Sequence, residues 1–327
     1  MAKIRVGIMG YGNIGRGVEA ALRQNPDFEL AAVFTRRDPA TVTIDTPGAV
    51  VVNDKDAPAY KDKIDVMALC GGSRDDLPAQ GPQFAAMFNI VDSFDTHAKI
   101  PEYLAGVDAA AKAAGRVAVI STGWDPGLFS MLRLLSGSVL PEGSDYTFWG
   151  NGVSQGHSSA IRGIPGVKDA IQYTVPIDSA LAAVRTGDRP TLTTREKHTR
   201  VCYVVPEEGA DKAQIEQSIK TMKNYFDEYD TTVHFITVEE LRRDHAAMPH
   251  GGFVFRSGST GKGHKQIVEF SLRLESNPEF TAGVMVAFMR AAYRLNKEGK
   301  TGGYTAFDIP LSYLSADSRD NLIKNLL

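Results

Sequence analysis

The chain opens with MAKIRVGIMGYGNIGRGVEAALR (residues 1–23), and this stretch predicts how its first half folds. Residues 3–9 (KIRVGIM) are typical of a β-strand, and Ile14, Val18 and Leu22 recur at helical spacing directly after the glycines. Between them lies a G-x-G-x-x-G pattern. A strand, a glycine turn and a helix in this order favour a dinucleotide-binding site over a glycine turn that serves packing alone.

Each glycine of the pattern has a separate physical task. Gly10 allows the tight turn, Gly12 lets the backbone approach a pyrophosphate, and Gly15 lets the helix pack closely on the strand. The N-terminus of the following helix then presents N–H groups and a partial positive charge to the anion. We therefore expect the pyrophosphate of a dinucleotide at this turn.

The next apolar run, residues 29–35, ends in Thr35, Arg36 and Arg37 instead of the acid that grips the ribose hydroxyls of NAD. A hydroxyl and two guanidinium groups match a phosphate dianion in charge and in donor geometry. This predicts NADP in preference to NAD. The alternative is a solvated pair of charges on a loop.

The composition narrows the class of protein. A length of 327 residues favours two domains, and a net charge of −3 with a pI near 6.2 argues against nucleic-acid or membrane partners. We expect a cytoplasmic protein, because no signal peptide or membrane-spanning run is evident. The two cysteines, Cys70 and Cys202, have no metal or redox spacing, and we predict no metal site.

Short apolar runs continue at residues 65–70, 89–94 and 116–122, and helical stretches separate several of them. This alternation predicts an α/β fold with a doubly wound, Rossmann-type parallel sheet over residues 1–123. Longer strands follow, with a hairpin across residues 251–274, so we expect a second, mixed α+β domain for substrate binding and dimerisation over 124–302. A C-terminal segment from about residue 303 to 327 either stays there or returns to the first domain. The apolar helix near 281–295 packs on the first domain or on a second subunit.

Strands of a doubly wound sheet end on one edge, and ligands bind beyond that edge. Residues 10–15, 35–37, 70–76, 92–97 and 121–127 follow the predicted strands, so they should line one crevice. Asp95 and Asp125 lie there beside Phe94 and Trp124, and neighbouring carboxylates suit an ammonium group. Either acid could instead cap a helix or a turn. Asp92 lies closer to its strand, which indicates a structural role.

The second domain carries a different set of polar residues. Residues 149–160 (WGNGVSQGHSSA) are rich in glycine and small donors, as a loop that wraps an anion would be. Arg200 lies on an otherwise apolar strand and requires a carboxylate partner, either from a substrate or from an internal salt bridge. His250, in MPHGG, is a ligand-binding or a structural residue.

Taken together, these segments resemble the meso-diaminopimelate dehydrogenases of bacterial lysine biosynthesis almost from end to end. The shared motifs, in order, are GYGNIGR, FTRR, DSFDTH, STGWDPGLFS, TFWG, SQGHS, IRGIPGV, QYTVP, MPHGG and NPEFTA. The resemblance implies reversible NADP-dependent deamination of the D-centre of meso-2,6-diaminopimelate to L-2-amino-6-oxopimelate and ammonia, in a homodimer. Ser159 stands where some members carry an acid, which bears on substrate breadth but not on the reaction.

The resemblance also implies roles for individual residues. Cofactor contacts fall on Gly10, Tyr11, Gly12, Asn13, Ile14, Gly15, Thr35, Arg36, Arg37, Gly72 and Ser73. The reacting centre falls on Asp95 and Asp125, with Trp124, Gln155 and Gly156 alongside, and the distal end on Thr174, Arg200, His250 and Asn277, with Trp149 shaping the pocket. We expect Asp125 or Asp95 to take the proton of the ammonium group or to orient the water that adds to the imine, and a path through water is equally open.

Other functions remain as alternatives on the residues alone. Another NADPH-linked reductase of an imine or oxo acid has the same nucleotide motif, and an NADPH-binding sensor without turnover would keep it too. A dehydrogenase that forms a thioester needs a reactive cysteine, and Cys70 has no recognisable base partner. A sensor is expected to lack the matched acids and carboxylate-binding residues that this chain has.

Overall fold

The computed structural model describes residues 3–327, which form two compact units. The first comprises residues 3–131 together with residues 278–327, and the second comprises residues 132–277. The first unit thus takes in residues 278–302, which we expected in the second domain, because helix α10 (Asn277–Lys297) is buried along most of its length against the sheet of the first unit. Each unit is described by itself.

The first unit is built on a parallel sheet of seven strands in the order β14-β6-β5-β4-β1-β2-β3. The predicted doubly wound α/β fold is confirmed. Strands β3 and β14 at the two edges were missed, because VVVN and GGY are too short for a recognisable pattern. The strands are β1 Ile4–Met9, β2 Phe28–Thr35, β3 Val50–Asn53, β4 Val66–Leu69, β5 Asn89–Asp92, β6 Val117–Val119 and β14 Gly302–Tyr304.

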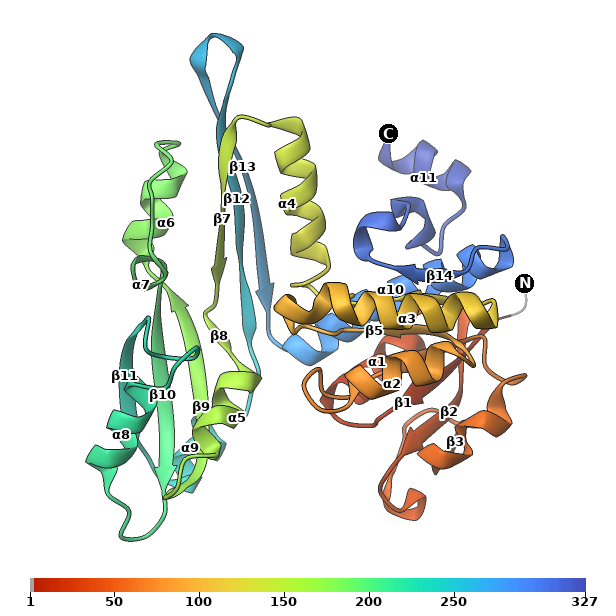
Figure 1. Cartoon of the computed structure of the whole chain (residues 1–327), viewed down its shortest axis with the longest axis horizontal. Helices are drawn as coiled ribbons and strands as arrows, with labels where there is room; N and C mark the ends of the chain where they lie inside the picture. Colours follow the sequence, from red (N-terminus) through yellow and green to blue (C-terminus); the bar gives the residue numbers. More distant parts are fainter. Residues whose placement is uncertain (1–2) are drawn as a thin grey trace. The chain divides into compact units, whose positions relative to one another are not determined.

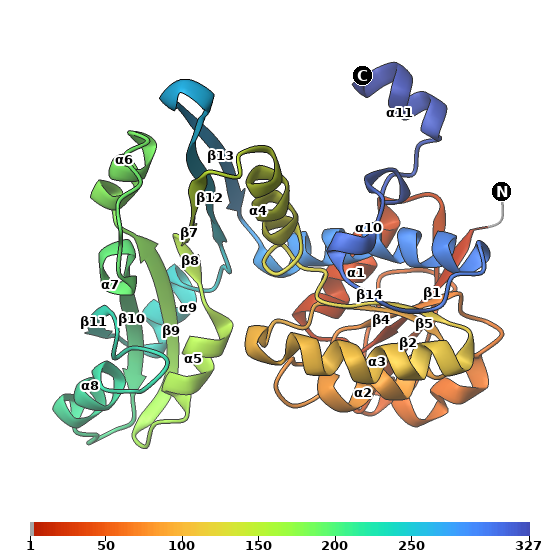
Figure 2. The same ribbon diagram turned by 45° about the horizontal axis from the view of Figure 1, so that its top comes forward.

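Helices cover both faces of this sheet (Figure 1). α1 (Asn13–Arg23) and α10 bury their apolar side chains in one core cluster, while α2 (Leu77–Ala85) and α3 (Ile100–Ala114) form the other. The two layers are visible again in Figure 2. Arg290 of α10 is buried and paired with Asp27 at 2.6 Å, which fastens this helix to the turn before β2.

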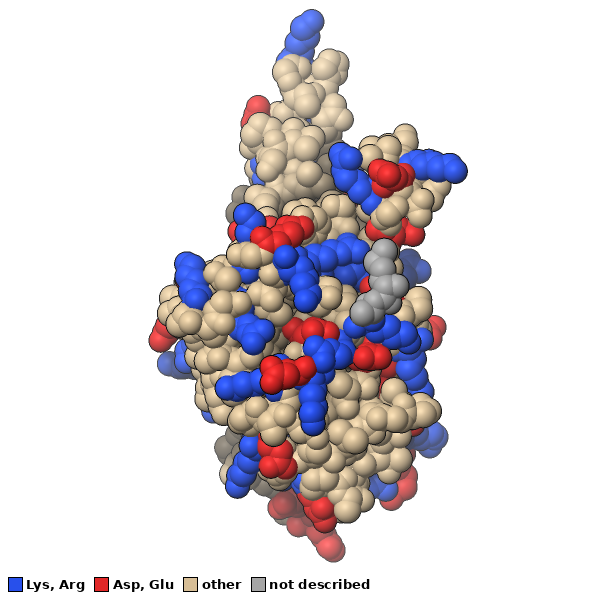
Figure 3. All heavy atoms as spheres, turned by 90° about the vertical axis from the view of Figure 1, so that its right-hand side faces the viewer, with Lys and Arg blue, Asp and Glu red and all other residues tan. Residues whose placement is uncertain are grey.

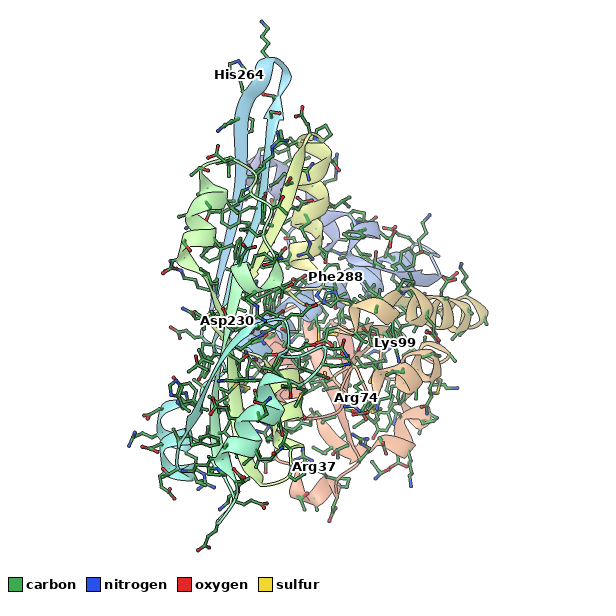
Figure 4. All side chains as sticks on the ribbon, turned by 60° about the vertical axis from the view of Figure 1, so that its left-hand side comes forward. Arg37, Arg74, Lys99, Asp230, His264 and Phe288 are labelled. Atoms are coloured by element: carbon green, nitrogen blue, oxygen red, sulfur yellow. The ribbon has the colours of Figure 1, made fainter. Side chains whose placement is uncertain are left out.

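The second unit contains two sheets. The four-stranded sheet has the order β11-β10-β9-β8 and the three-stranded antiparallel sheet has the order β13-β12-β7. β12 and β13 form the predicted hairpin, paired from His250–Leu274 to Thr260–His264, and Figure 4 shows His264 at its tip. The strands are β7 Gly143–Trp149, β8 Gly152–Val153, β9 Val167–Pro176, β10 His198–Pro206, β11 Asp230–Phe235, β12 His250–Thr260 and β13 His264–Leu274.

The remaining helices are short. Those of the second unit are α5 Gln155–Arg162, α6 Asp178–Arg185, α7 Thr194–Lys197, α8 Lys212–Lys220 and α9 Val238–Asp244; α4 Leu128–Val139 begins in the first unit, and α11 Arg319–Leu326 follows the last strand. Turns of 3₁₀ helix lie at Pro39–Thr41, Asp54–Tyr60, His97–Lys99, Gly261–Gly263, Ala306–Asp308 and Leu311–Tyr313.

The charges of the surface are mixed in sign. On the face drawn in Figure 3, basic and acidic side chains alternate without forming a region of one sign. Within residues 3–327, no helix combines the length and the apolar character that a bilayer crossing requires.

Candidate functional site

The glycine turn after β1 has the shape of a pyrophosphate cradle. Gly10 has a φ of +91°, in the region that favours glycine, and a Cβ on Gly15 would lie 2.2 Å from the carbonyl oxygen of Gly10. A Cβ on Gly12 would meet no atom within 4 Å, so the backbone is open there. No side chain caps α1 at Gly12. An anion therefore fits against the first turn of the helix, where Asn13 and Ile14 lie.

The end of β2 holds the predicted phosphate-binding residues in an ordered arrangement. The hydroxyl of the buried Thr35 accepts a hydrogen bond from the Arg37 N–H at 3.1 Å, and the Arg37 guanidinium donates to the carbonyl of Tyr11 at 2.8 Å. Arg36 is 71% exposed and pairs with Asp76 at 2.9 Å. The two arginines therefore flank the glycine turn, as a 2′-phosphate site requires, although Asp76 offsets part of the positive charge.

A buried carboxylate below this turn was not predicted. Glu19 of α1 is 1% exposed and accepts hydrogen bonds from the Tyr11 hydroxyl and from the N–H groups of Asp45 and Thr46. Burial alone would raise the pKa of Glu19, but these hydrogen bonds lower it. Glu19 thus ties Tyr11, and through its carbonyl Arg37, to the loop before β3.

The loops after β4 and β5 meet at the same edge. The Gly72 N–H donates to the carboxylate of Asp76 at 2.9 Å, and the Ser73 hydroxyl accepts from the Asp95 N–H at 3.1 Å. Asp95 is exposed. We call the segments that follow the predicted strands the carboxyl edge: residues 10–15, 35–37, 70–76, 92–97 and 121–127. Figure 4 labels Arg37 and Arg74, which belong to it, and Lys99, which follows it in sequence.

Asp92 organises the two loops that carry the predicted acids. Its side chain is fully buried, and its Oδ1 accepts the N–H groups of Phe94 and Ser121, both at 3.0 Å. Its Oδ2 accepts the hydroxyl of Tyr103 at 2.6 Å. Burial raises the pKa of Asp92, and these three donors oppose that shift. The structural role that we expected for Asp92 is therefore a cross-link between the loops of Asp95 and Asp125.

Asp125 and its neighbours lie in a tightly packed turn. Asp125 is half-buried and precedes Pro126 through a cis peptide bond. Trp124 is 7% exposed, and its ring meets Phe129 edge to face at 5.2 Å. The residue before Asp125 is thus anchored by apolar packing.

In the second unit, the four-stranded sheet aligns one residue from each strand in a single row across the sheet. Gly152 of β8 pairs with Thr174 of β9, Thr174 pairs with Arg200 of β10, and Arg200 pairs with Thr231 of β11. A Cβ on Gly152 would lie 2.4 Å from the ring of His250, so this glycine makes room for the histidine. We call His250, Thr174, Arg200 and Thr231 the Arg200 row.

Arg200 is a buried cation that forms no ion pair within the described part of the chain. It is 6% exposed, its Nη1 donates to the Thr174 hydroxyl, and its Nε is buried without a hydrogen-bond partner. Among the described residues no carboxylate pairs with it, which contradicts the alternative of an internal salt bridge. Burial lowers the pKa of Arg200, and Tyr229, whose ring lies 3.9 Å below the guanidinium carbon, opposes that shift. No pattern in the sequence indicated that Tyr229 contacts Arg200.

The other predicted residues of this unit surround the row. The Trp149 N–H donates to Nε2 of His198 at 2.9 Å, and the two rings stack at 5.5 Å. The Gly251 N–H donates to Nδ1 of His250 at 2.8 Å. Gln155 begins α5 and donates to the sulfur of Met248 at 3.4 Å, a Cβ on Gly156 would meet nothing within 4 Å, and the Asn277 N–H donates to the carbonyl of Met248.

The buried His198 and the half-buried His157, both near Arg200, are neutral. Burial, together with the charge of Arg200, lowers the pKa of His198 to about 3 and that of His157 to about 4. A neutral His198 accepts from Trp149 without adding positive charge beside Arg200. Burial also raises the pKa of the Cys70 thiol, which opposes the thiolate that a thioester mechanism needs. Within residues 3–327, no group of three His, Cys, Asp or Glu side chains is arranged to hold a metal ion.

A doubly wound sheet with a dinucleotide turn, two arginines after β2 and a separate unit bearing a buried carboxylate-seeking arginine defines an NADP-dependent oxidoreductase of the two-domain type. Residues 123–276 match the family described as diaminopimelic acid dehydrogenase C-terminal domain. The meso-diaminopimelate D-dehydrogenase of Ureibacillus thermosphaericus is 64% identical over 327 residues, covering all of both chains. The chain belongs to the meso-diaminopimelate D-dehydrogenase family, and the resemblance predicted from the sequence is confirmed.

Solved structures agree with this assignment. The C. glutamicum DAP dehydrogenase in complex with DAP superimposes with a TM-score of 0.94 at 43% identity, covering all of both chains. An engineered D-amino acid dehydrogenase bound to NADP⁺ superimposes with a TM-score of 0.89 at 42% identity, also over the full length of both chains.

Proposed function

We propose that this protein catalyses the reversible, NADP-dependent oxidative deamination of the D-centre of meso-2,6-diaminopimelate, a reaction of lysine biosynthesis. The products are L-2-amino-6-oxopimelate, ammonia and NADPH. The observation that supports the proposal is the buried Arg200, which pairs with no carboxylate among residues 3–327, in a chain of this family. A substrate with a second carboxylate, distant from the reacting amine, supplies the missing partner.

The residues of the carboxyl edge fit the cofactor. Gly10 to Gly15 would hold the pyrophosphate, Thr35, Arg36 and Arg37 the 2′-phosphate, and Gly72 and Ser73 the neighbouring part of the nucleotide. Bound NADP⁺ supplies the acceptor for the hydride. The open Cβ position of Gly12 and the uncapped start of α1 support this assignment.

Asp95 and Asp125 are proposed to hold the D-ammonium group, and one of them, directly or through a water, is proposed to take its proton. The carbon that bears the amine then gives up a hydride, and the C–N bond becomes an imine. Water adds to that imine, ammonia leaves, and the oxo acid remains. Trp124, Gln155 and Gly156 are proposed to orient this end of the substrate, while Trp149, Thr174, Arg200, His250 and Asn277 hold the distal end.

The test is an absorbance assay at the NADPH band with the meso, LL and DD isomers of diaminopimelate, each with NADP⁺ and with NAD⁺. We expect reduction of NADP⁺ with the meso isomer, little with the LL isomer, and a large loss with NAD⁺. Purified protein that leaves NADP⁺ unreduced with the meso isomer contradicts the proposal.

We also propose that the protein is a homodimer. Leu134, Leu135 and Val139 of α4 are 51%, 59% and 71% exposed, and Val268 of β13 is 41% exposed. Val268 shares a face of the sheet with Arg256, whose side chain bonds to the carbonyls of Leu140 and Pro141 directly after α4. Apolar side chains of this size, exposed together on neighbouring elements, favour an interface between copies.

The dimer is tested by light scattering coupled to size-exclusion chromatography. Leu135→Glu with Val139→Lys should yield monomers if this surface forms the interface, whereas an unchanged mass contradicts the surface. A monomeric wild type contradicts the dimer itself.

We also propose a cytoplasmic location. The two free thiols support it, because reducing compartments keep cysteines unpaired.

A further inference from the structure

The Arg200 guanidinium is held from one direction by an aromatic ring. The ring of Tyr229 lies 3.9 Å from the guanidinium carbon, the shortest cation–ring contact among the described residues. Tyr229 is the residue before β11, and the parallel pairing of β10 with β11 places Thr231 beside Arg200. The register of the sheet therefore positions the ring over the cation.

A second buried arginine shows what Arg200 lacks. Arg256 of β12 is 8% exposed, and its donors reach the carbonyls of Leu140 and Pro141 and the carboxylate of Asp145. Arg200 donates to the Thr174 hydroxyl and also has a hydrogen bond with the Tyr229 side chain, but its Nε has no partner. The protein leaves donors of Arg200 for another acceptor, and hydrogen bonds alone do not determine the plane of its guanidinium.

We propose that Tyr229 is a positioning residue that sets the selectivity of this enzyme for substrates with a second carboxylate. Its ring supports one face of the Arg200 guanidinium, so that the unpaired Nε and the remaining N–H groups point in a constant direction. A bidentate contact with a carboxylate depends strongly on that plane. The inference rests on the proposed function, because it names Arg200 as the group that receives the distal carboxylate.

The ring also favours the charged state of a cation that has been removed from water. A cation over an aromatic face gains an attraction that increases when the pair is desolvated, and Arg200 is nearly inaccessible. Without the ring, the side chain can rotate toward solvent or toward another acceptor. Loss of the ring should therefore weaken binding of the diacid while leaving the chemistry at the D-centre unchanged.

The experiment compares Tyr229→Leu with Tyr229→Phe, each in the wild-type background and in an Arg200→Met background. We expect Tyr229→Leu to raise the KM for meso-diaminopimelate roughly tenfold with less than a twofold change in kcat. Tyr229→Phe keeps the ring and removes only the hydroxyl, so its KM should stay close to the wild-type value, because the ring contact carries the effect. In the Arg200→Met background, Tyr229→Leu should add no further effect, because the ring acts only through the guanidinium.

Tyr203→Leu is the matched control. Tyr203 lies on the opposite face of β10, where it packs against His245 at 3.9 Å and His234 at 5.2 Å. It should lose stability, measured by thermal unfolding, without changing the KM for the diacid. A Tyr229→Leu effect that persists without Arg200, that falls on kcat, or that is absent overturns the inference.

Calorimetric titration with meso-diaminopimelate separates the two proposals. If the wild type binds the diacid tightly, Tyr229→Leu binds it about tenfold more weakly, and turnover is absent, the proposed function fails and the inference stands. If the wild type turns over and Tyr229→Leu binds equally well, the inference fails alone. Equal affinity of wild type and Tyr229→Leu without turnover overturns both.

Discussion

The carboxyl edge of the first unit and the Arg200 row of the second differ in how their buried charged groups are hydrogen-bonded. At the carboxyl edge, the buried carboxylate Asp92 receives two N–H groups and a tyrosine hydroxyl, so the scaffold under Asp95 and Asp125 is complete without a ligand. In the Arg200 row, the buried Arg200 forms no ion pair with a carboxylate that the structure describes, and its Nε has no hydrogen-bond partner. Substitutions at the first region should therefore damage folding and cofactor binding, and substitutions at the second should change substrate choice.

The largest effect is expected at the glycine turn. Gly15→Ala places a Cβ 2.2 Å from the carbonyl of Gly10, and we expect a loss of about 3 kcal/mol or more in the free energy of unfolding. NADP⁺ binding should disappear with it, as followed by fluorescence titration and urea denaturation. Gly12→Ala is the control, because its Cβ meets nothing within 4 Å: stability should be kept and only the affinity for NADP⁺ should fall. Equal stability of both variants would contradict this view of the turn.

The second effect separates selectivity from stability. Arg200→Met removes the receptor for the distal carboxylate, so kcat/KM for meso-diaminopimelate should fall roughly 10²- to 10³-fold, and that for D-amino acids without a second carboxylate much less. Arg256→Met removes the other buried arginine of this unit and should lower the melting temperature while keeping the ratio between the two substrates. Equal losses for both substrates in Arg200→Met would exclude a carboxylate clamp.

The same contrast explains what the sequence could predict. The glycine turn and the residues after β2 lie within a few positions of recognisable strands, so their common edge follows from the alternation of strands and helices, and this fold prediction is confirmed. The contact of Tyr229 with Arg200 depends on the register between β10 and β11, which no local pattern encodes. The edge strands β3 and β14 were missed because they are short. Helix α10 was assigned to the second domain because an apolar pattern shows that a helix is buried but not which element it packs against. The roles of Asp95, Asp125 and the distal residues stay predictions.

A third variant tests whether the carboxyl edge acts as one support. Asp92→Asn places an amide donor against the Tyr103 hydroxyl and removes the charge that three donors surround, so the loops of Asp95 and Asp125 should lose their common anchor. We expect kcat to fall roughly tenfold, with a loss of about 1–3 kcal/mol in the free energy of unfolding. Asp65→Asn, at the amino end of β4 where Asp65 pairs with Arg5 at 2.9 Å, should lose stability with kcat unchanged. A kcat that changes equally in both variants would assign Asp92 to folding alone.

The smallest expected effect is the pH dependence of stability that arises from His198, which lies near Arg200. His198 has a pKa of about 3 in the folded protein and an ordinary value near 6.5 when unfolded, so it takes up a proton on unfolding below pH 6.5. Its contribution to stability is therefore complete above that pH and is lost as the pH falls toward 3. Between pH 7 and pH 5 the loss from this residue is about 2 kcal/mol in the free energy of unfolding.

His198→Gln tests this linkage because its side-chain oxygen can still accept from the Trp149 N–H, while the group no longer titrates. Urea denaturation at pH 7 and at pH 5 should show a smaller loss for the variant than for the wild type. His157, with a pKa of about 4, provides a residual dependence of the same sign in both proteins. Identical pH slopes in the two proteins would mean that the pKa of His198 is the same in the folded and unfolded states, and at pH 5 a second positive charge would then stand beside Arg200.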